Sequence, residues 1–91
     1  MKVLVQLPPG LSRYSDGEEF HESTEQTVGE VLADLVERFP ELESRLLDPT
    51  REMRSYLMVF RNGEVMPRDT MSQCELSDGD TVRLMFMAGG G

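Results

Sequence analysis

The sequence predicts an α+β fold in which one main helix packs on a mixed β-sheet. Two observations lead to this class. Stretches with the composition of strands occupy residues 2–7, 18–23, 56–61 and 81–87, whereas one long amphipathic helix pattern occupies residues 28–39. Helices and strands therefore do not alternate strictly along the chain, which argues against a doubly wound α/β fold.

Two strands joined as a hairpin are predicted near the N-terminus. Residues 2–7 are rich in Val and Leu and partly alternate, and Pro8-Pro9-Gly10 ends them. A polar loop follows, with Ser15-Asp16-Gly17 as its turn signal. Residues 18–23 can return as the second strand, although Phe20 is their only strongly apolar residue.

The clearest element is a helix that begins after Thr27. Thr27 and Glu30 have the spacing of a capping box, in which each side chain accepts a hydrogen bond from an otherwise unpaired backbone N–H. Pro40 ends the helix, residues 41–47 form a second short helix or turn, and residues 48–55 lack periodicity and are expected to be an exposed loop. The apolar residues form one stripe at helical spacing: Val28, Val31, Leu32, Leu35, Val36 and Phe39.

A second hairpin and a final strand are predicted in the C-terminal half. Residues 56–61 have strong strand composition, and Asn62-Gly63 is the best hairpin signal in the chain. Residues 64–66 return briefly as the partner strand. A loop then runs to Ser77-Asp78-Gly79-Asp80, and residues 81–87 form the last strand, which leads directly into the terminal glycines.

Length and composition favour one small domain that binds other proteins. The 91 residues carry a net charge of −8, which argues against nucleic acid binding, because phosphate contacts require clustered Lys and Arg. The acidic charge instead favours solubility and attraction to a basic protein surface. The single cysteine, Cys74, excludes an internal disulfide and fits a reducing cytosol. No apolar run approaches the roughly 20 residues of a membrane span, and no signal-peptide pattern occurs, so we expect a cytoplasmic protein.

The sequence ends on Gly89, Gly90 and Gly91, which do not belong to any turn. Glycine has no Cβ, so such a tail can enter a narrow channel and present an unhindered carboxylate. A frayed terminus or a cloning scar is the alternative interpretation. We expect residues 1–87 to form the domain and residues 88–91 to form a flexible C-terminal tail.

Four stretches, in register with the terminal diglycine, are similar to those of a known family. They are Thr27–Leu35, Phe39–Leu46, Val59–Glu64 and Ser77–Val82. The chain resembles the ubiquitin-like sulfur carriers, which include the small subunit of molybdopterin synthase, the thiamine and cysteine-synthesis carriers and the archaeal small modifiers. The resemblance implies a β-grasp, ubiquitin-like fold.

The sequence departs from the family at two places. The strand that leads to the tail often contains proline in the family, but Leu84–Met87 contains none. The family commonly has another small residue where this chain has Gly89, so only Gly90 and Gly91 correspond to the functional glycine pair.

The resemblance also implies how such a tail would react. A ubiquitin-activating-type partner uses ATP and Mg²⁺ to adenylate the Gly91 carboxylate, and a sulfur nucleophile then produces a thiocarboxylate. The chain would be a protein cosubstrate, not an enzyme, with no cofactor of its own. Its other partners would be a downstream sulfur-acceptor synthase and, if a precursor is trimmed, a processing protease. Two alternatives remain: a protein modifier that is joined through Gly91 to target lysines, and a plain interaction module.

A docking face for these partners is predicted on the last strand. Strand alternation places Val82, Leu84 and Phe86 on one side and Met85 and Met87 on the other. If the first set packs on the helix, the two methionines are exposed beside the neighbouring strand. Methionine is soft enough to pack against several partners, whereas the alternative is that these side chains are core or scattered surface residues. The predicted docking face comprises Met58, Phe60, Met85 and Met87.

No catalytic or metal-binding constellation occurs in the sequence. Cys74 has no basic cluster around it in sequence and is expected to be an ordinary thiol. His21 has no companions for a metal site. Asp78-Gly79-Asp80 lacks the remaining ligand spacing of a calcium loop and is expected to form a turn.

Overall fold

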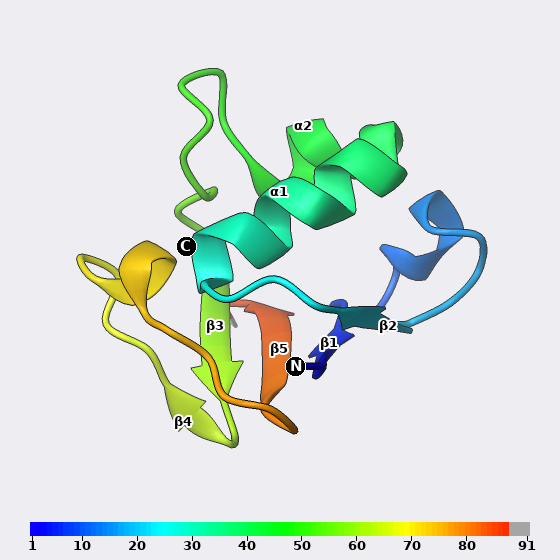
Figure 1. The fold of residues 1–91 in the computed structure, drawn as a ribbon. Helices are drawn as coiled ribbons and strands as arrows, with labels where there is room; N and C mark the ends of the chain where they lie inside the picture. Colours follow the sequence, from blue (N-terminus) through cyan, green and yellow to red (C-terminus); the bar gives the residue numbers. More distant parts are fainter. Residues whose placement is uncertain (88–91) are drawn as a thin grey trace.

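The computed structural model describes residues 1–87, and these form a mixed sheet with the helices on one side of it (Figure 1). The five strands lie in the order β2-β1-β5-β3-β4, with the last strand in the centre. Strand β5 runs parallel to β1 and antiparallel to β3. The predicted α+β class is confirmed, and the arrangement is the β-grasp, ubiquitin-like fold. The strands are β1 Val3–Gln6, β2 Phe20–Ser23, β3 Leu57–Arg61, β4 Glu64–Val65 and β5 Thr81–Phe86.

The predicted tail, residues 88–91, lies outside the described residues, and with it Gly89, Gly90 and Gly91. The last described residue, Met87, directly follows β5. Within residues 1–87, no helix is long and apolar enough to cross a membrane.

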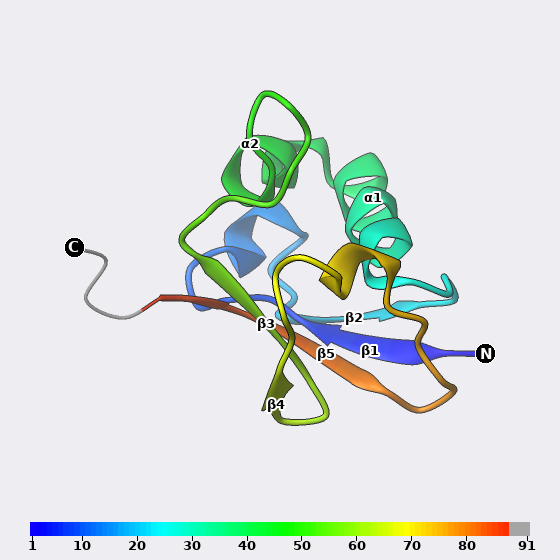
Figure 2. The ribbon, with the colours of Figure 1, turned by 90° about the vertical axis from the view of Figure 1, so that its left-hand side faces the viewer.

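Helix α1 (Val28–Arg38) is the main helix, and its start confirms the predicted capping box. The Glu30 backbone N–H donates to Thr27 Oγ1 at 3.1 Å, and the Thr27 N–H donates to Glu30 Oε1 at 3.1 Å. Two short helical segments follow, η2 (Pro40–Leu42) and α2 (Glu43–Leu46). Figure 2 shows these helices above the sheet and the opposite side of the sheet without a helix.

The hydrophobic core lies between the helices and the inner face of the sheet. Strand alternation sends every second side chain into it, while the helix contributes its predicted apolar stripe. Phe39 follows the end of α1 and is only partly buried against the core. The most deeply buried members are Val5, Val28, Val31, Leu35, Leu42, Leu46, Val82 and Leu84.

Strand β2 is present as predicted, but the side chains that it turns toward the core are polar. Phe20 points away from the core and is 50% exposed, whereas His21 and Ser23 are buried. One His21 ring nitrogen lies 2.9 Å from the Glu18 carbonyl oxygen, and the ring contacts the Phe39 ring at a centroid distance of 4.9 Å. The His21 ring therefore has a hydrogen-bond partner and packs against Phe39 at the edge of the core.

Two 3₁₀ turns lie in segments that the sequence indicated only as loops. They are η1 (Ser12–Tyr14) and η3 (Met71–Gln73). The second turn packs against the start of α1, where a Cβ on Gly29 would lie 2.9 Å from the Ser72 carbonyl oxygen. The chain approaches this closely only because residue 29 is glycine.

Candidate functional site

The uncovered side of the sheet carries an apolar surface around β3 and β5. Met58 and Met85 face each other directly across these two strands, and both are partly buried. Phe60 lies opposite Arg83 on one side and opposite Val65 of β4 on the other. Along β3 and β5 these residues alternate with the buried ones, so their side chains lie on the outer face of the sheet. Val65 lies on the same face because it is the direct partner of Phe60.

The same surface continues across β1 and β2. Leu4 is 38% exposed and Phe20 is 50% exposed, and Gln6 pairs with both Phe20 and Arg83. Leu4, Phe20 and Val65 were not part of the predicted docking face. The alternation of apolar residues in 2–7 could have placed Leu4 on the outer face, because it lies between the inward Val3 and Val5. We define the outer-face patch as Leu4, Phe20, Met58, Phe60, Val65 and Met85.

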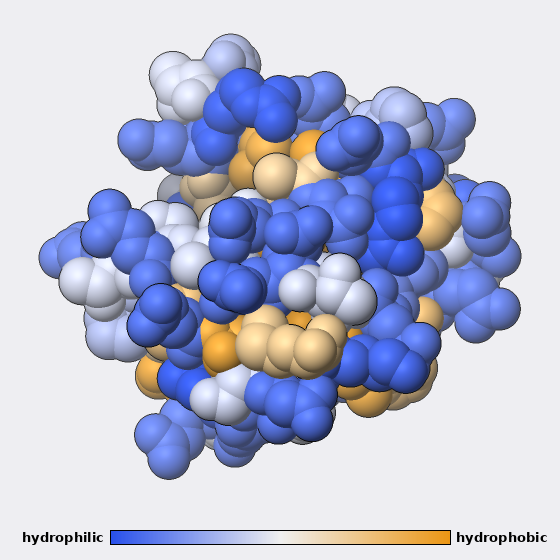
Figure 3. Space-filling model, in the orientation of Figure 1, coloured by the Kyte–Doolittle hydropathy of each residue, from blue (hydrophilic) through white to orange (hydrophobic). Residues whose placement is uncertain are grey.

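The opposite side of the molecule differs in character. Figure 3 shows that the face that carries α1 is predominantly hydrophilic, with apolar surface only in small separate areas. A hollow of about 570 Å³ lies there between α1, the loop after α2 and η3. Its rim carries Arg51, Glu52, Arg68 and Asp69, but Arg51 is paired with Glu43 and Arg68 with backbone carbonyls.

Aromatic side chains surround the point where the chain leaves the sheet. The Met87 N–H donates to the Tyr56 carbonyl oxygen at 2.7 Å, which extends the pairing of β3 and β5 by one step. The Tyr56 and Phe86 rings contact each other at a centroid distance of 5.8 Å. Tyr56, Phe86 and Met87 are 42%, 39% and 48% exposed. We call these three residues the exit cluster.

Strand alternation groups Phe86 with Val82 and Leu84, but Phe86 does not share their burial. Its partner across the ladder, Leu57, is buried, and so is Leu84 on the same side of β5. Phe86 is the last residue of β5, where the core ends, and its ring contacts Tyr56 at the surface. Met87 is exposed as predicted, while Met85, Met58 and Phe60 are each partly buried within the surface.

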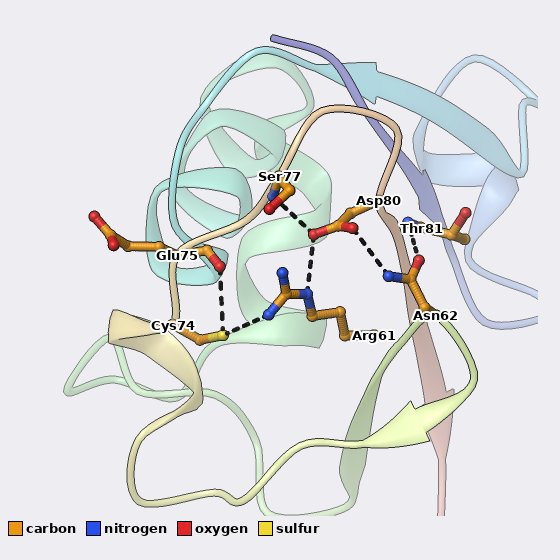
Figure 4. Close-up of polar contacts among 7 residues, drawn as sticks. All are labelled: Arg61, Asn62, Cys74, Glu75, Ser77, Asp80 and Thr81. Atoms are coloured by element: carbon orange, nitrogen blue, oxygen red, sulfur yellow. Dashed lines mark hydrogen bonds and ion pairs between the residues drawn. The ribbon is translucent and has the colours of Figure 1, made fainter.

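The beginning of β5 is fixed by a buried carboxylate, as Figure 4 shows. Asp80 accepts hydrogen bonds from the Ser77 N–H at 2.8 Å, Asn62 Nδ2 at 2.9 Å and Arg61 Nε at 2.9 Å. Asn62 in turn accepts from the Thr81 N–H at 2.9 Å. These bonds join the β3–β4 turn to the turn before β5. The Ser77 N–H, followed by Asn62 and Arg61, lowers the pKa of Asp80 below its ordinary value.

Cys74 lies at the edge of the same network. Arg61 Nη1 lies 3.5 Å from Cys74 Sγ, a contact between residues that are far apart in sequence. The sequence therefore could not indicate a basic neighbour for this thiol. The thiol also lies 3.7 Å from the Glu75 carbonyl oxygen. Among residues 1–87, no group of three or more His, Cys, Asp and Glu side chains could hold a metal ion.

A comparison with protein families identifies the chain. The model of the ThiS family matches residues 6–91, which is nearly the whole sequence and includes the terminal glycines. The chain belongs to the ThiS family. This confirms the resemblance to the ubiquitin-like sulfur carriers.

The chain is similar over nearly its whole length to individual known proteins. The sulfur carrier protein CysO of Mycobacterium tuberculosis is 25% identical over 93 residues, which cover all of both chains. The solved small archaeal modifier protein 1 of Haloferax volcanii is 26% identical, with a TM-score of 0.82, over 96% of this chain and 98% of the other. The chain is also similar to one in the BexX/CysO complex of Amycolatopsis orientalis, with 27% identity, a TM-score of 0.83 and coverage of 98% and 99%.

Proposed function

We propose that this protein is a sulfur carrier that transports sulfur as a thiocarboxylate on Gly91. The observation that carries the proposal is the family match, because it extends without a break to the terminal glycine pair. The similarity to the mycobacterial carrier over the full length of both chains supports the same function.

The chemistry requires an activating partner. A carboxylate is a poor acyl electrophile because its oxygen is a bad leaving group. In the proposed reaction, a ubiquitin-activating-type enzyme uses ATP and Mg²⁺ to convert the Gly91 carboxylate into an acyl adenylate. A sulfur nucleophile then displaces AMP and leaves the thiocarboxylate. The absence of side chains on Gly90 and Gly91 suits this attack, because a Cβ would crowd the reacting carbon.

We propose that the activating enzyme recognises the outer-face patch and the exit cluster together. Met58 and Met85 form the centre of the patch on the same strand pair that leads to the tail. Phe60 and Met87 extend the contact on either side. A partner that covers this surface would bury apolar area and guide residues 88–91, including Gly89, into its channel. Arg83, which lies opposite Phe60, gives the largely apolar surface around β3 and β5 a positive charge for orientation.

The proposed function can be tested by mass spectrometry of the C-terminal tryptic fragment, Leu84 to Gly91. The protein is incubated with ATP, Mg²⁺, a sulfur donor and the activating enzyme of its host, and the product is trapped by alkylation. Fragment ions are required to place the sulfur on Gly91, because methionine oxidation and exchange of oxygen for sulfur give nearly the same nominal mass shift. A Cys74→Ser background removes the competing thiol.

The expected result is sulfur on Gly91 in the wild-type chain and little sulfur in Gly91→Ala. A chain without Gly90 and Gly91 should be inert. Modification in both altered chains would refute the proposal, and so would an unmodified Gly91 when the same enzyme converts a known carrier.

A second candidate function is protein modification through Gly91. It is favoured by the similarity to the archaeal modifier protein, which matches the fold and length of this chain as closely as the carriers do. The two functions share the adenylation step and differ in the nucleophile. Isopeptide bonds between Gly91 and lysines of host proteins would support the modifier, whereas a thiocarboxylate consumed by a downstream synthase would support the carrier.

A further inference from the structure

The chain contains a single lysine, Lys2, because every other basic residue except His21 is arginine. This composition has a chemical consequence. An isopeptide bond requires a side-chain amine that can lose its proton, and the arginine guanidinium stays protonated in proteins. Among the side chains of these 91 residues, Lys2 is therefore the one amine that can accept an acyl group.

The surroundings of Lys2 leave this amine accessible. The backbone of Lys2 is held in place, since its N–H donates to Asp78 Oδ1 at 2.8 Å and its carbonyl oxygen accepts from the Gly79 N–H at 2.8 Å. The side chain is 63% exposed, and Nζ lies 3.5 Å from Glu22 Oε2, which is 65% exposed. An exposed ion pair of this kind is weak, so it leaves the Lys2 amine accessible to an incoming acyl group.

Lys2 lies at the end of the sheet opposite to the point where β5 ends. Strand β1 is parallel to β5, and Lys2 is level with Gly79, before β5 begins. Figure 2 shows the N-terminus and the end of β5 on opposite sides of the molecule. Eight residues separate Gly79 from Met87, or about 26 Å at roughly 3.3 Å per strand residue. The four residues after Met87 span at most about 14 Å when fully extended. The tail therefore cannot reach the Lys2 amine of its own chain.

We propose that Lys2 is an acceptor site for the Gly91 acyl group of a second copy of this chain. Each copy then offers one donor and one acceptor at opposite ends. The products of self-conjugation are linear, unbranched chains in which every bond joins Gly91 to Lys2. This inference rests on the modifier function proposed above.

The reaction balances with the activated tail as the acyl donor. The deprotonated Lys2 Nζ attacks the carbonyl carbon of the Gly91 acyl adenylate on the other copy. A C–N bond forms, the bond between that carbon and the AMP oxygen breaks, and AMP leaves with its electron pair. The amine releases its remaining excess proton to solvent, and an isopeptide bond results.

The test uses the full chain with ATP, Mg²⁺ and the activating enzyme of the host, with cell extract as a source of other acceptor proteins. Three proteins are compared: the wild type, Lys2→Arg and Glu22→Gln. Lys2→Arg keeps the positive charge beside Glu22 but removes the acceptor amine. Glu22→Gln removes the ion pair but keeps the amine. Pyrophosphate release measures adenylation, and thermal unfolding confirms that each variant is folded.

The expected result is a ladder of dimers and longer species in the wild type and in Glu22→Gln. Trypsin cleaves after Arg83, so the branch is Leu84–Gly91 attached to Lys2 Nζ, a peptide that fragment ions identify. Lys2→Arg should lose self-conjugates by at least tenfold while it still modifies lysines of other proteins.

Two outcomes would overturn the inference alone. One is a ladder that persists in Lys2→Arg, with the branch on the α-amine or another group. The other is conjugation of Gly91 to foreign lysines with no wild-type copy modified at Lys2. If adenylation proceeds but no amine of any protein is modified, the modifier function itself fails, and this inference fails with it.

Discussion

The buried carboxylate of Asp80 gives the strongest prediction about stability, and the change that tests it is Asp80→Asn. The substitution keeps the size and shape of the side chain and removes its charge. Asp80 is only 7% exposed and accepts three hydrogen bonds, from the Ser77 N–H, Asn62 and Arg61. In the variant, the new amide group must face at least one of these donors, and Arg61 loses its counter-ion.

The expected cost follows from these three bonds. A hydrogen bond to a charged group contributes about 1 kcal/mol more than a neutral one, so the variant should lose about 2–3 kcal/mol in the free energy of unfolding. A domain of 91 residues unfolds with an entropy of about 0.19 kcal/mol/K, so Tm should fall by about 10–15 °C at pH 7. Asp78→Asn is the matched control, because Asp78 lies in the same turn but is exposed. We expect it to change stability by only about 0.5 kcal/mol.

The same variant predicts a pH dependence with a defined sign. Since the native pKa of Asp80 lies below the ordinary value of 3.8, the unfolded state binds this proton more readily than the folded state. The stabilisation is therefore complete above pH 3.8 and is lost as the pH falls through the lowered native pKa. Thermal or urea unfolding of the wild type and Asp80→Asn should be measured between pH 7 and pH 2. The difference in their free energies of unfolding should become smaller as the pH falls below 3.8. A stability difference that stays constant with pH would refute the conclusion that the charge of Asp80 stabilises the fold. A Tm loss no larger than that of Asp78→Asn would refute it as well.

Three further changes test the packing and the docking face. Gly29→Ala should lower the free energy of unfolding by about 1–2 kcal/mol in denaturant titrations, despite the better helix propensity of Ala, because η3 must move away from the new Cβ. Arg68→Lys should raise hydrogen exchange in the loop before β3, because lysine cannot replace the fork that donates to Leu57 and Arg54 carbonyls at 3.0 and 2.7 Å; unchanged exchange would contradict this. Met85→Asp should weaken binding to the activating enzyme about tenfold or more, measured by calorimetry, while Tm changes little.

Most of the fold could be predicted because the local signals agree with one another. The capping box at Thr27, the apolar stripe of the helix and the Asn62-Gly63 turn each specify a boundary, and all three are present. The strand order could not be worked out from these signals. Which strands pair depends on contacts between distant residues, and the structure is what shows the last strand in the centre of the sheet, between β1 and β3.

The candidate site could be predicted only where strand alternation was sufficient. Alternation placed Met58, Met85 and Met87 correctly relative to the helix side. It was misleading for Phe86, because alternation fixes the direction of a side chain but not the extent of the layer that covers it. The contact between Arg61 and Cys74 joins residues from two separate loops, so no local pattern contained it.

The position of β5 fits the proposal that this small domain presents the Gly91 carboxylate to a partner. A central strand is hydrogen-bonded on both sides, here to β1 and β3, so its end can shift only if two ladders are broken. The Asp80 network fixes the start of this strand, and the Met87–Tyr56 bond fixes its end. In the proposed complex, docking at Met85 would therefore set the place from which residues 88–91 enter the partner. If this reasoning is correct, Met85→Asp lowers the rate of adenylation at Gly91 through KM and leaves kcat nearly unchanged, because the reacting atoms are the same once the complex has formed. A fall in kcat with KM unchanged would show that the patch acts on the chemistry and not on docking.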